Sequence, residues 1–191
     1  MGTLLGDAWR LVRDTVEARV PAARALRGRD PALGGDYPAV FWLAWLASSA
    51  TRVCDLGGQV SAAVRQHRRY LKIPDSVQWT VCPARFADAD ASDVLFACGA
   101  SLERMPLPLH RRLLRLARKP VHVVVNRVPF DEQDPFQRIL FRGGMERAGY
   151  ELLDEWDNGR AGGLDFSGMY FRLGRTQLNA LPSARSADAR Y

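Results

Sequence analysis

The stretch Arg52–Ser61, which reads RVCDLGGQVS, decides how the rest of the chain is interpreted. A short apolar run ends at Asp55, two glycines follow at Gly57 and Gly58, and a helical pattern begins directly after them. Glycine has no Cβ atom, so the backbone can turn sharply and a ligand can approach it closely. The following helix offers free N–H groups at its start. The stretch therefore predicts the first parallel strand of an open α/β sheet, followed by a ligand-binding turn.

The rest of the chain alternates between strand and helix patterns. Strands are expected at 51–55, 77–82, 93–98, 121–125, 150–156 and 167–173. Helices are expected at 38–49, 59–71, 106–119 and 135–149, and a glycine-rich turn at 158–163. This order predicts a parallel, doubly wound α/β sheet that closes with an antiparallel hairpin. Such sheets bind ligands at the carboxyl ends of their strands, where the strand order reverses.

The length of 191 residues suggests one domain with additional ends. We expect an N-terminal helical cap and loop at 1–36, an α/β domain at 37–175 and a disordered tail at 176–191. Apolar residues recur at helical spacing within 3–27, which fits either a cap packed on the core or a helix that binds a partner.

The cysteines and the hydropathy pattern favour a cytoplasmic protein. Cys54, Cys82 and Cys98 all lie in apolar runs, and no C-x-x-C pair occurs. Buried thiols are therefore expected, without a disulfide framework or a metal site. The longest apolar stretch, 39–47, is too short to span a bilayer, and no signal peptide is expected.

The formal net charge of +6 permits an acidic partner such as nucleic acid but does not establish one. The basic side chains gather on two predicted helices: Arg65, Arg68, Arg69 and Lys72 on one, and Arg111, Arg112, Arg115, Arg118 and Lys119 on the other. An RNA-binding module that uses these faces is one possible function, and solvated helix faces are the simpler interpretation.

Five short motifs, taken in order, resemble a known family. They are DLGG at 55–58, WTV at 79–81, DVLF at 93–96 with GASL at 99–102, NRVPF at 126–130 and GMYF at 168–171. Across residues 37–175 the chain resembles the bacterial LIC12133-type family of S-adenosylmethionine-dependent methyltransferases. The resemblance implies a Rossmann-like class I methyltransferase fold, S-adenosylmethionine as cofactor, and an unknown small-molecule or glycan-type acceptor.

The resemblance also implies roles for particular residues, although it identifies no catalytic residue. Asp55, Gly57 and Gly58 would form the cofactor turn, and Asp55 would either receive the cofactor's ammonium group or simply cap the following helix. Cys82 would end the second strand of the cofactor site. The methionine part of the cofactor would lie beside Gly99, Ala100 and Ser101. Asn126 and Arg127 would face the substrate.

The sequence departs from the usual pattern of this fold in two places. Methyltransferases of the class usually end the second strand with an acid that binds the ribose, and Cys82 stands there instead. The chain between that strand and Asp93 is also too short for the usual helix and third strand. An alternative function is therefore that of a catalytically inactive methyltransferase-like protein, which binds a partner protein or another small ligand.

Overall fold

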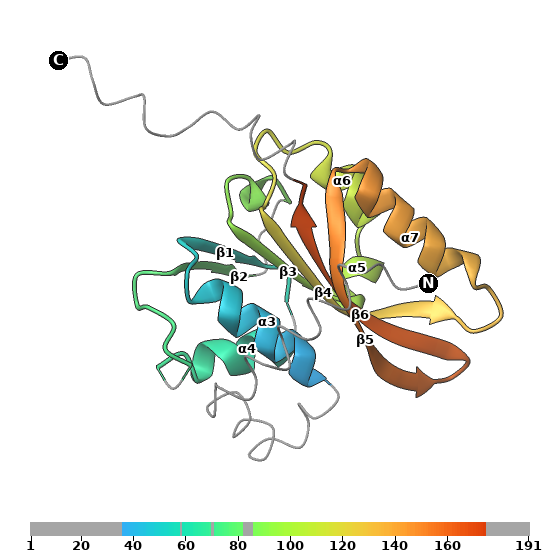
Figure 1. The fold of residues 1–191 in the computed structure, drawn as a ribbon, viewed down its shortest axis with the longest axis horizontal. Helices are drawn as coiled ribbons and strands as arrows, with labels where there is room; N and C mark the ends of the chain where they lie inside the picture. The colour runs from blue at the N-terminus through green and yellow to red at the C-terminus, as the bar shows by residue number, and fades with distance from the viewer. Residues whose placement is uncertain (1–35, 58, 70, 82–85, 175–191) are drawn as a thin grey trace.

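The computed structural model describes residues 36–57, 59–69, 71–81 and 86–174. These residues contain one six-stranded sheet with the order β2-β1-β3-β4-β6-β5 (Figure 1). The strands are β1 (Arg52–Asp55), β2 (Gln78–Val81), β3 (Val94–Cys98), β4 (His122–Asp131), β5 (Tyr150–Ala161) and β6 (Leu164–Leu173). The first four run parallel, and β6 is antiparallel to both β4 and β5. The predicted Rossmann-like sheet with a terminal antiparallel hairpin is confirmed. Within the described residues β2 is the edge strand of the sheet.

Helices cover both faces of the sheet (Figure 1). On one face lie α3 (Tyr37–Ala47) and α4 (Gln59–Gln66); on the other lie α5 (Gly99–Glu103), α6 (Leu109–Leu113) and α7 (Phe136–Arg147), and a 3₁₀ turn, η2, spans Phe86–Ala89. Residues 94–97 of β3 are fully buried because each face of this central strand meets a helical layer. The predicted helix at 38–49 is confirmed as α3, and its nearly all-round apolar surface is buried except at Trp45.

The hairpin and the end of β4 extend the sheet beyond its parallel core. β4 and β5 continue to residues 131 and 161 rather than ending at 125 and 156 as expected, and the predicted turn at 158–163 contracts to Gly162 and Gly163. The reason is that β6 pairs with both strands along their outer halves, including Pro129 with Phe166 and Arg160 with Asp165. The result is a three-stranded extension at the carboxyl end of the parallel strands.

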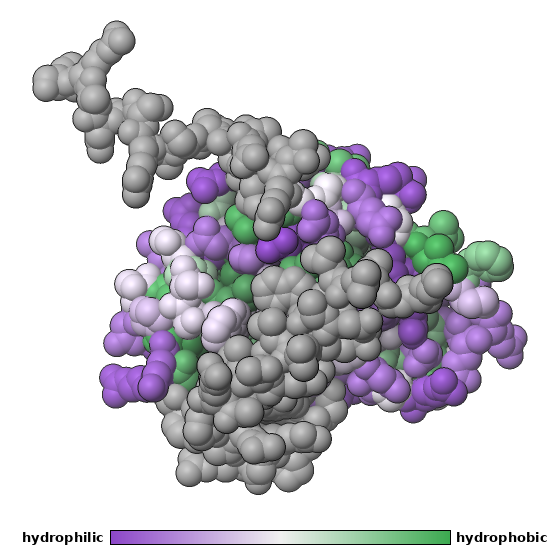
Figure 2. Space-filling model, in the orientation of Figure 1, coloured by the Kyte–Doolittle hydropathy of each residue, from purple (hydrophilic) through white to green (hydrophobic). Residues whose placement is uncertain are grey.

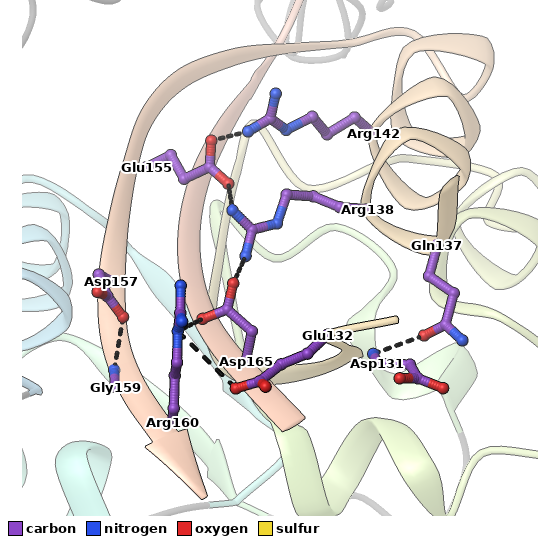
Figure 3. Close-up of polar contacts among 10 residues, drawn as sticks. All are labelled: Asp131, Glu132, Gln137, Arg138, Arg142, Glu155, Asp157, Gly159, Arg160 and Asp165. Atoms are coloured by element: carbon purple, nitrogen blue, oxygen red, sulfur yellow. Dashed lines mark hydrogen bonds and ion pairs between the residues drawn. The ribbon is translucent and has the colours of Figure 1, made fainter. Parts of the chain in front are cut away.

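Ion pairs join this extension to α7 (Figure 3). Arg138 of α7 pairs with Asp165 of β6 at 2.5 Å and with Glu155 of β5 at 3.7 Å, and Arg142 also pairs with Glu155. The first turns of α7 leave an apolar surface exposed, which Figure 2 shows as a hydrophobic area beside the start of the helix. Its members are Phe136, Ile139 and Leu140.

The predicted helix at 106–119 is wrong in length, because only α6, residues 109–113, is α-helical. The Arg118 N–H donates to Asp90 Oδ1 at 2.5 Å instead of to a carbonyl one turn earlier. The N–H of Ala91 then bonds to the Arg118 carbonyl at 3.2 Å. These two hydrogen bonds hold residues 114–119, which form turns, against residues 90–91. Similarly, the helix expected at 59–71 ends as α4 at Gln66.

A register shift divides β4 into two halves. Between Val125 and Val128 the chain carries one more residue than β6 does between their partners, Met169 and Ser167. The extra residue falls at 126–127, where Arg127 has a left-handed φ of +51°. Bulges of this kind re-aim side chains at the edge of a sheet. Both predicted substrate residues, Asn126 and Arg127, therefore lie in the bulge.

Candidate functional site

The strand order reverses between β1 and β3. The chain runs from β1 to β2 at one edge and then crosses back to β3 on the other side of β1. The carboxyl ends of these two strands therefore form the switch point, the usual ligand site of an open α/β sheet. Ser101 Oγ, which follows β3, donates to the Leu56 carbonyl, which follows β1, at 2.7 Å. This bond ties together two loops that are 45 residues apart in sequence.

Asp55 organises the turn after β1. Its carboxylate is fully buried and accepts hydrogen bonds from the Gly57 N–H at 2.8 Å and from Ser61 Oγ at 2.5 Å. Arg65 Nε, one turn further along α4, lies 3.8 Å away. Gly57 has a φ of +108°, a backbone conformation that favours glycine. The Asp55 carboxylate therefore holds the turn after β1 against Ser61 of α4, and both of its predicted roles stay predictions.

At Gly99, in the loop after β3, close packing rather than a backbone turn requires glycine. A Cβ atom on Gly99 would overlap the carbonyl group of Arg127, so the close approach of the β4 bulge requires glycine here. Gly99 and Ser101 are buried, whereas Ala100 is exposed. Gly58 and Cys82 lie outside the described residues, so their predicted roles stay predictions.

Asp36 is a residue of this site that sequence reasoning missed. It is 4% exposed and directly precedes α3. Its Oδ1 accepts from Asn126 Nδ2 and Arg127 Nε, both at 2.8 Å, while Oδ2 accepts from Arg127 Nη2 at 3.1 Å. Asn158 Nδ2 approaches Oδ1 at 3.4 Å. In the sequence Asp36 is one polar residue of a loop, and nothing local distinguishes it from a turn former.

Asn126 and Arg127 are brought together but have different surroundings. Asn126 is 1% exposed, and its amide joins Asp36 to Trp156, whose Nε1 donates to Asn126 Oδ1 at 3.2 Å. The Arg127 side chain is 45% exposed. Asn126 thus holds other groups in place, and Arg127 is the member of the pair that can meet a ligand.

Within the part of the chain that the structure describes, no three His, Cys, Asp or Glu side chains gather as a metal site would require. Cys54 is buried and Cys98 half-buried, and neither forms a disulfide bond with a residue that the structure describes. None of the described helices is both long and apolar enough to cross a membrane.

No protein-family model matches the chain, and a comparison with curated proteins finds no match. Among solved structures, the 1,6-didemethyltoxoflavin-N1-methyltransferase of Burkholderia thailandensis, with bound 1,6-didemethyltoxoflavin and S-adenosylhomocysteine, is 15% identical. The match covers 88% of this chain and 89% of that chain, with a TM-score of 0.49. TYW2 of M. jannaschii, in complex with AdoMet, is 12% identical over 73% of this chain and 76% of that chain, with a TM-score of 0.38. Likeness at this level does not establish an activity, and the resemblance to the LIC12133-type family stays a prediction.

Proposed function

We propose that the protein is an S-adenosylmethionine-dependent methyltransferase that acts on a small-molecule acceptor. The observation that carries the proposal is the switch point. Residues of two separate motifs, at Leu56–Gly57 and Gly99–Ser101, converge there, and the Ser101–Leu56 hydrogen bond joins them. An open α/β sheet places its ligand at this position, and the motif order of the chain resembles methyltransferases.

The described residues fit the methionine part of the cofactor through backbone rather than through side chains. Leu56 and Gly57 are half-buried and Ala100 is exposed, and the proposal places the cofactor against the main chain of these residues. The Asp55 carboxylate and Ser101 hydroxyl are occupied by the chain's own groups. When bound, the cofactor would supply an activated methyl group, and the contribution of this chain would be to align the acceptor with it.

The ribose part has less support, because the sequence places Cys82 where an acid is usual. A hydrogen bond to a charged group contributes about 1.5–3 kcal/mol, so a missing ribose anchor weakens binding by roughly one to two orders of magnitude. We therefore expect weak cofactor binding, with a dissociation constant of about 0.1–1 mM, that is, −5.5 to −4.1 kcal/mol.

Isothermal titration calorimetry with S-adenosylmethionine and S-adenosylhomocysteine tests the proposal. We expect both ligands to bind in this range. Absence of binding at several millimolar would overturn the proposal. Binding without methyl transfer to any acceptor in an assay with radiolabelled cofactor would instead favour the catalytically inactive alternative.

A second candidate function, RNA binding, has one observation in its favour. Arg111, Arg115 and Arg118 are exposed and form no ion pair with any residue that the structure describes. Burial, together with the charges of Arg147 and Arg111, lowers the pKa of His110 from its usual value of 6.5. The surface formed by α6 and the end of α7 is therefore electropositive, as a phosphate-binding surface would be.

A further inference from the structure

The Arg127 guanidinium is anchored on one side and open on the other. Its Nε and Nη2 donate to Asp36, while Nη1 donates to no described group. The hydrogen bond to Asp36 raises the pKa of Arg127. In the β3–β4 pairing Cys98 lies opposite Asn126, the residue before Arg127. Since Cys98 is the last residue of β3, Arg127 lies next to the switch point.

The backbone fixes the position of this guanidinium. Arg127 adopts a left-handed φ of +51°, which is unfavourable for a residue with a side chain. Two interactions maintain this conformation: the Arg127 N–H donates to Asn158 Oδ1 at 3.2 Å, and the Arg127 side chain pairs with Asp36. In addition, Gly99 leaves space for the Arg127 carbonyl. A side chain held in this way loses little conformational freedom when it binds a ligand.

An apolar platform lies beside Arg127 on the same side of the extension. Pro129 and Phe166 are directly opposite each other in the β4–β6 pairing, and both are half-buried. Their neighbours in β4, Val128 and Phe130, face the α7 layer, so Pro129 faces the α3 side together with Asp36 and Arg127.

Open space lies beside Gly159, which is next to Phe166 in the hairpin. The β5–β6 pairing is interrupted between Asp157 and Arg160, and a Cβ atom on Gly159 would meet nothing within 4 Å. A flat ring could therefore lie on Phe166 and Pro129 with its edge toward Arg127.

The charge exposed at this edge is positive. Asp36 is 4% exposed and hydrogen-bonded by two asparagines as well as by Arg127, whereas the Arg127 side chain is 45% exposed. A ligand approaching from solvent would thus meet guanidinium N–H groups, and guanidinium binds carboxylates with matched geometry.

We propose that Arg127, Pro129 and Phe166 bind the methyl acceptor, and that the acceptor is a planar aromatic carboxylic acid. Arg127 Nη1 donates to the carboxylate, and the ring stacks on Phe166 and Pro129. Asn126, Asn158 and Asp36 are positioning residues that hold the guanidinium. This inference rests on the proposed methyltransferase function.

Calorimetry with three probes and no cofactor tests the inference. 2-Naphthoate is planar and anionic, naphthalene-2-carboxamide is planar and neutral, and cyclohexanecarboxylate is anionic and not planar. We expect 2-naphthoate to bind at least ten-fold more tightly than either of the others. Equal affinity for the naphthoate and the carboxamide would overturn the role of Arg127, and equal affinity for the two carboxylates would overturn the platform.

Two variants make the test specific. Arg127→Gln should weaken 2-naphthoate binding at least ten-fold and leave carboxamide binding unchanged, whereas Phe166→Leu should weaken both. Arg160→Gln is the matched control, because Arg160 lies on the same hairpin, is 71% exposed, and faces the α7 side. Since Arg127→Gln leaves Asp36 buried without its cation, the double variant Asp36→Asn/Arg127→Gln repeats the measurement without that charge. An unchanged 2-naphthoate affinity in both variants would overturn the inference.

The failure of this inference and that of the proposed function are distinguishable. If S-adenosylmethionine binds and 2-naphthoate does not, the acceptor class is wrong and the methyltransferase proposal stands. If 2-naphthoate binds in an Arg127-dependent way and S-adenosylmethionine does not, the methyltransferase proposal is overturned and the aromatic-acid site remains.

Discussion

Gly57 and Arg127 both have positive φ values, for different reasons. At Gly57 the conformation carries little steric penalty, and it turns the chain after β1 so that Asp55 can accept the Gly57 N–H. At Arg127 the conformation is costly, and the surrounding hydrogen bonds maintain it. The first position shapes the turn after β1, and the second aims a side chain.

Gly57→Ala tests the turn, with Gly163→Ala as the control. Both glycines have positive φ, +108° and +78°, but Gly163 lies in the hairpin turn, where a Cβ atom would meet nothing within 4 Å. Each change should cost about 1–2 kcal/mol of unfolding free energy, measured by urea denaturation. Only Gly57→Ala should weaken S-adenosylmethionine binding, by about ten-fold or more in calorimetry. Equal affinity for the cofactor in the two variants would contradict the assignment of this turn.

His122 should make stability depend on pH. Burial, with a further contribution from Arg172, lowers its pKa to about 4, and its Nδ1 lies 2.9 Å from the Tyr170 hydroxyl. Burial also raises the pKa of Tyr170, which therefore stays protonated and shares a hydrogen bond with the neutral imidazole. In the unfolded chain His122 takes up a proton near pH 6.5, whereas in the folded chain it does so only near pH 4. The stability that the neutral His122 contributes is therefore complete above pH 6.5 and is lost as the pH falls to about 4. The loss between pH 7 and pH 4 should be about 3 kcal/mol, since one pKa unit corresponds to about 1.4 kcal/mol.

Denaturant titrations between pH 7 and pH 4 measure this effect. The His122→Gln variant should lose less stability over that range than the wild-type chain, because glutamine does not titrate. Parallel stability curves for the two proteins would show that His122 is not the group responsible.

At the scale of elements, the extension depends on α7 for support. Glu155 and Asp165 are carboxylates of the hairpin, and Arg138 and Arg142 reach them from one face of the helix (Figure 3). Burial lowers the pKa of Arg142, and the neighbouring charge of Arg138 lowers it further. Glu155 is therefore the carboxylate that these two like charges share.

Glu155→Gln should destabilise the protein by about 1–2 kcal/mol, because two half-buried arginines lose their shared carboxylate. Glu132→Gln is the matched control: this carboxylate is 39% exposed and 3.8 Å from Arg160, so the loss should be about 0.5 kcal/mol or less. Thermal and urea unfolding of both variants supply the comparison. Similar losses for the two changes would mean that the Arg138–Glu155–Arg142 group contributes no more than an ordinary surface pair.

At the scale of the whole molecule, the parallel sheet could be predicted and the acceptor side of the site could not. The central strands contain continuous apolar runs at 94–98 and 123–125, and β1 ends at Asp55 before two glycines, so local patterns are sufficient to identify these strands. Asp36 acquires its role from contacts 90 and 91 residues away, which no local pattern reveals. The outer half of β4 was missed because the bulge at Asn126 and Arg127 interrupts the apolar run and shifts its alternation.

The net charge of +6 bears on the RNA alternative. If α6 and the following turns bind phosphates, the chain should retain single-stranded RNA at low salt, and affinity should fall with a log–log slope of about −2 for three contacts. Arg111→Glu/Arg115→Glu should abolish retention, and Arg160→Glu should not. Filter binding from 50 to 300 mM salt gives the slope, and loss of retention in the Arg160 variant as well would indicate a non-specific effect of charge.

The bulge in β4 also has an evolutionary consequence. Because it adds one residue relative to β6, removing a single codon at 126 or 127 would leave a regular strand, with Val125 and Val128 still facing the same layer. The sheet could lose this residue and keep its core. A one-codon deletion at 127 would remove the guanidinium and keep the core, so under the role proposed for Arg127 the length of this segment decides whether the acceptor is bound.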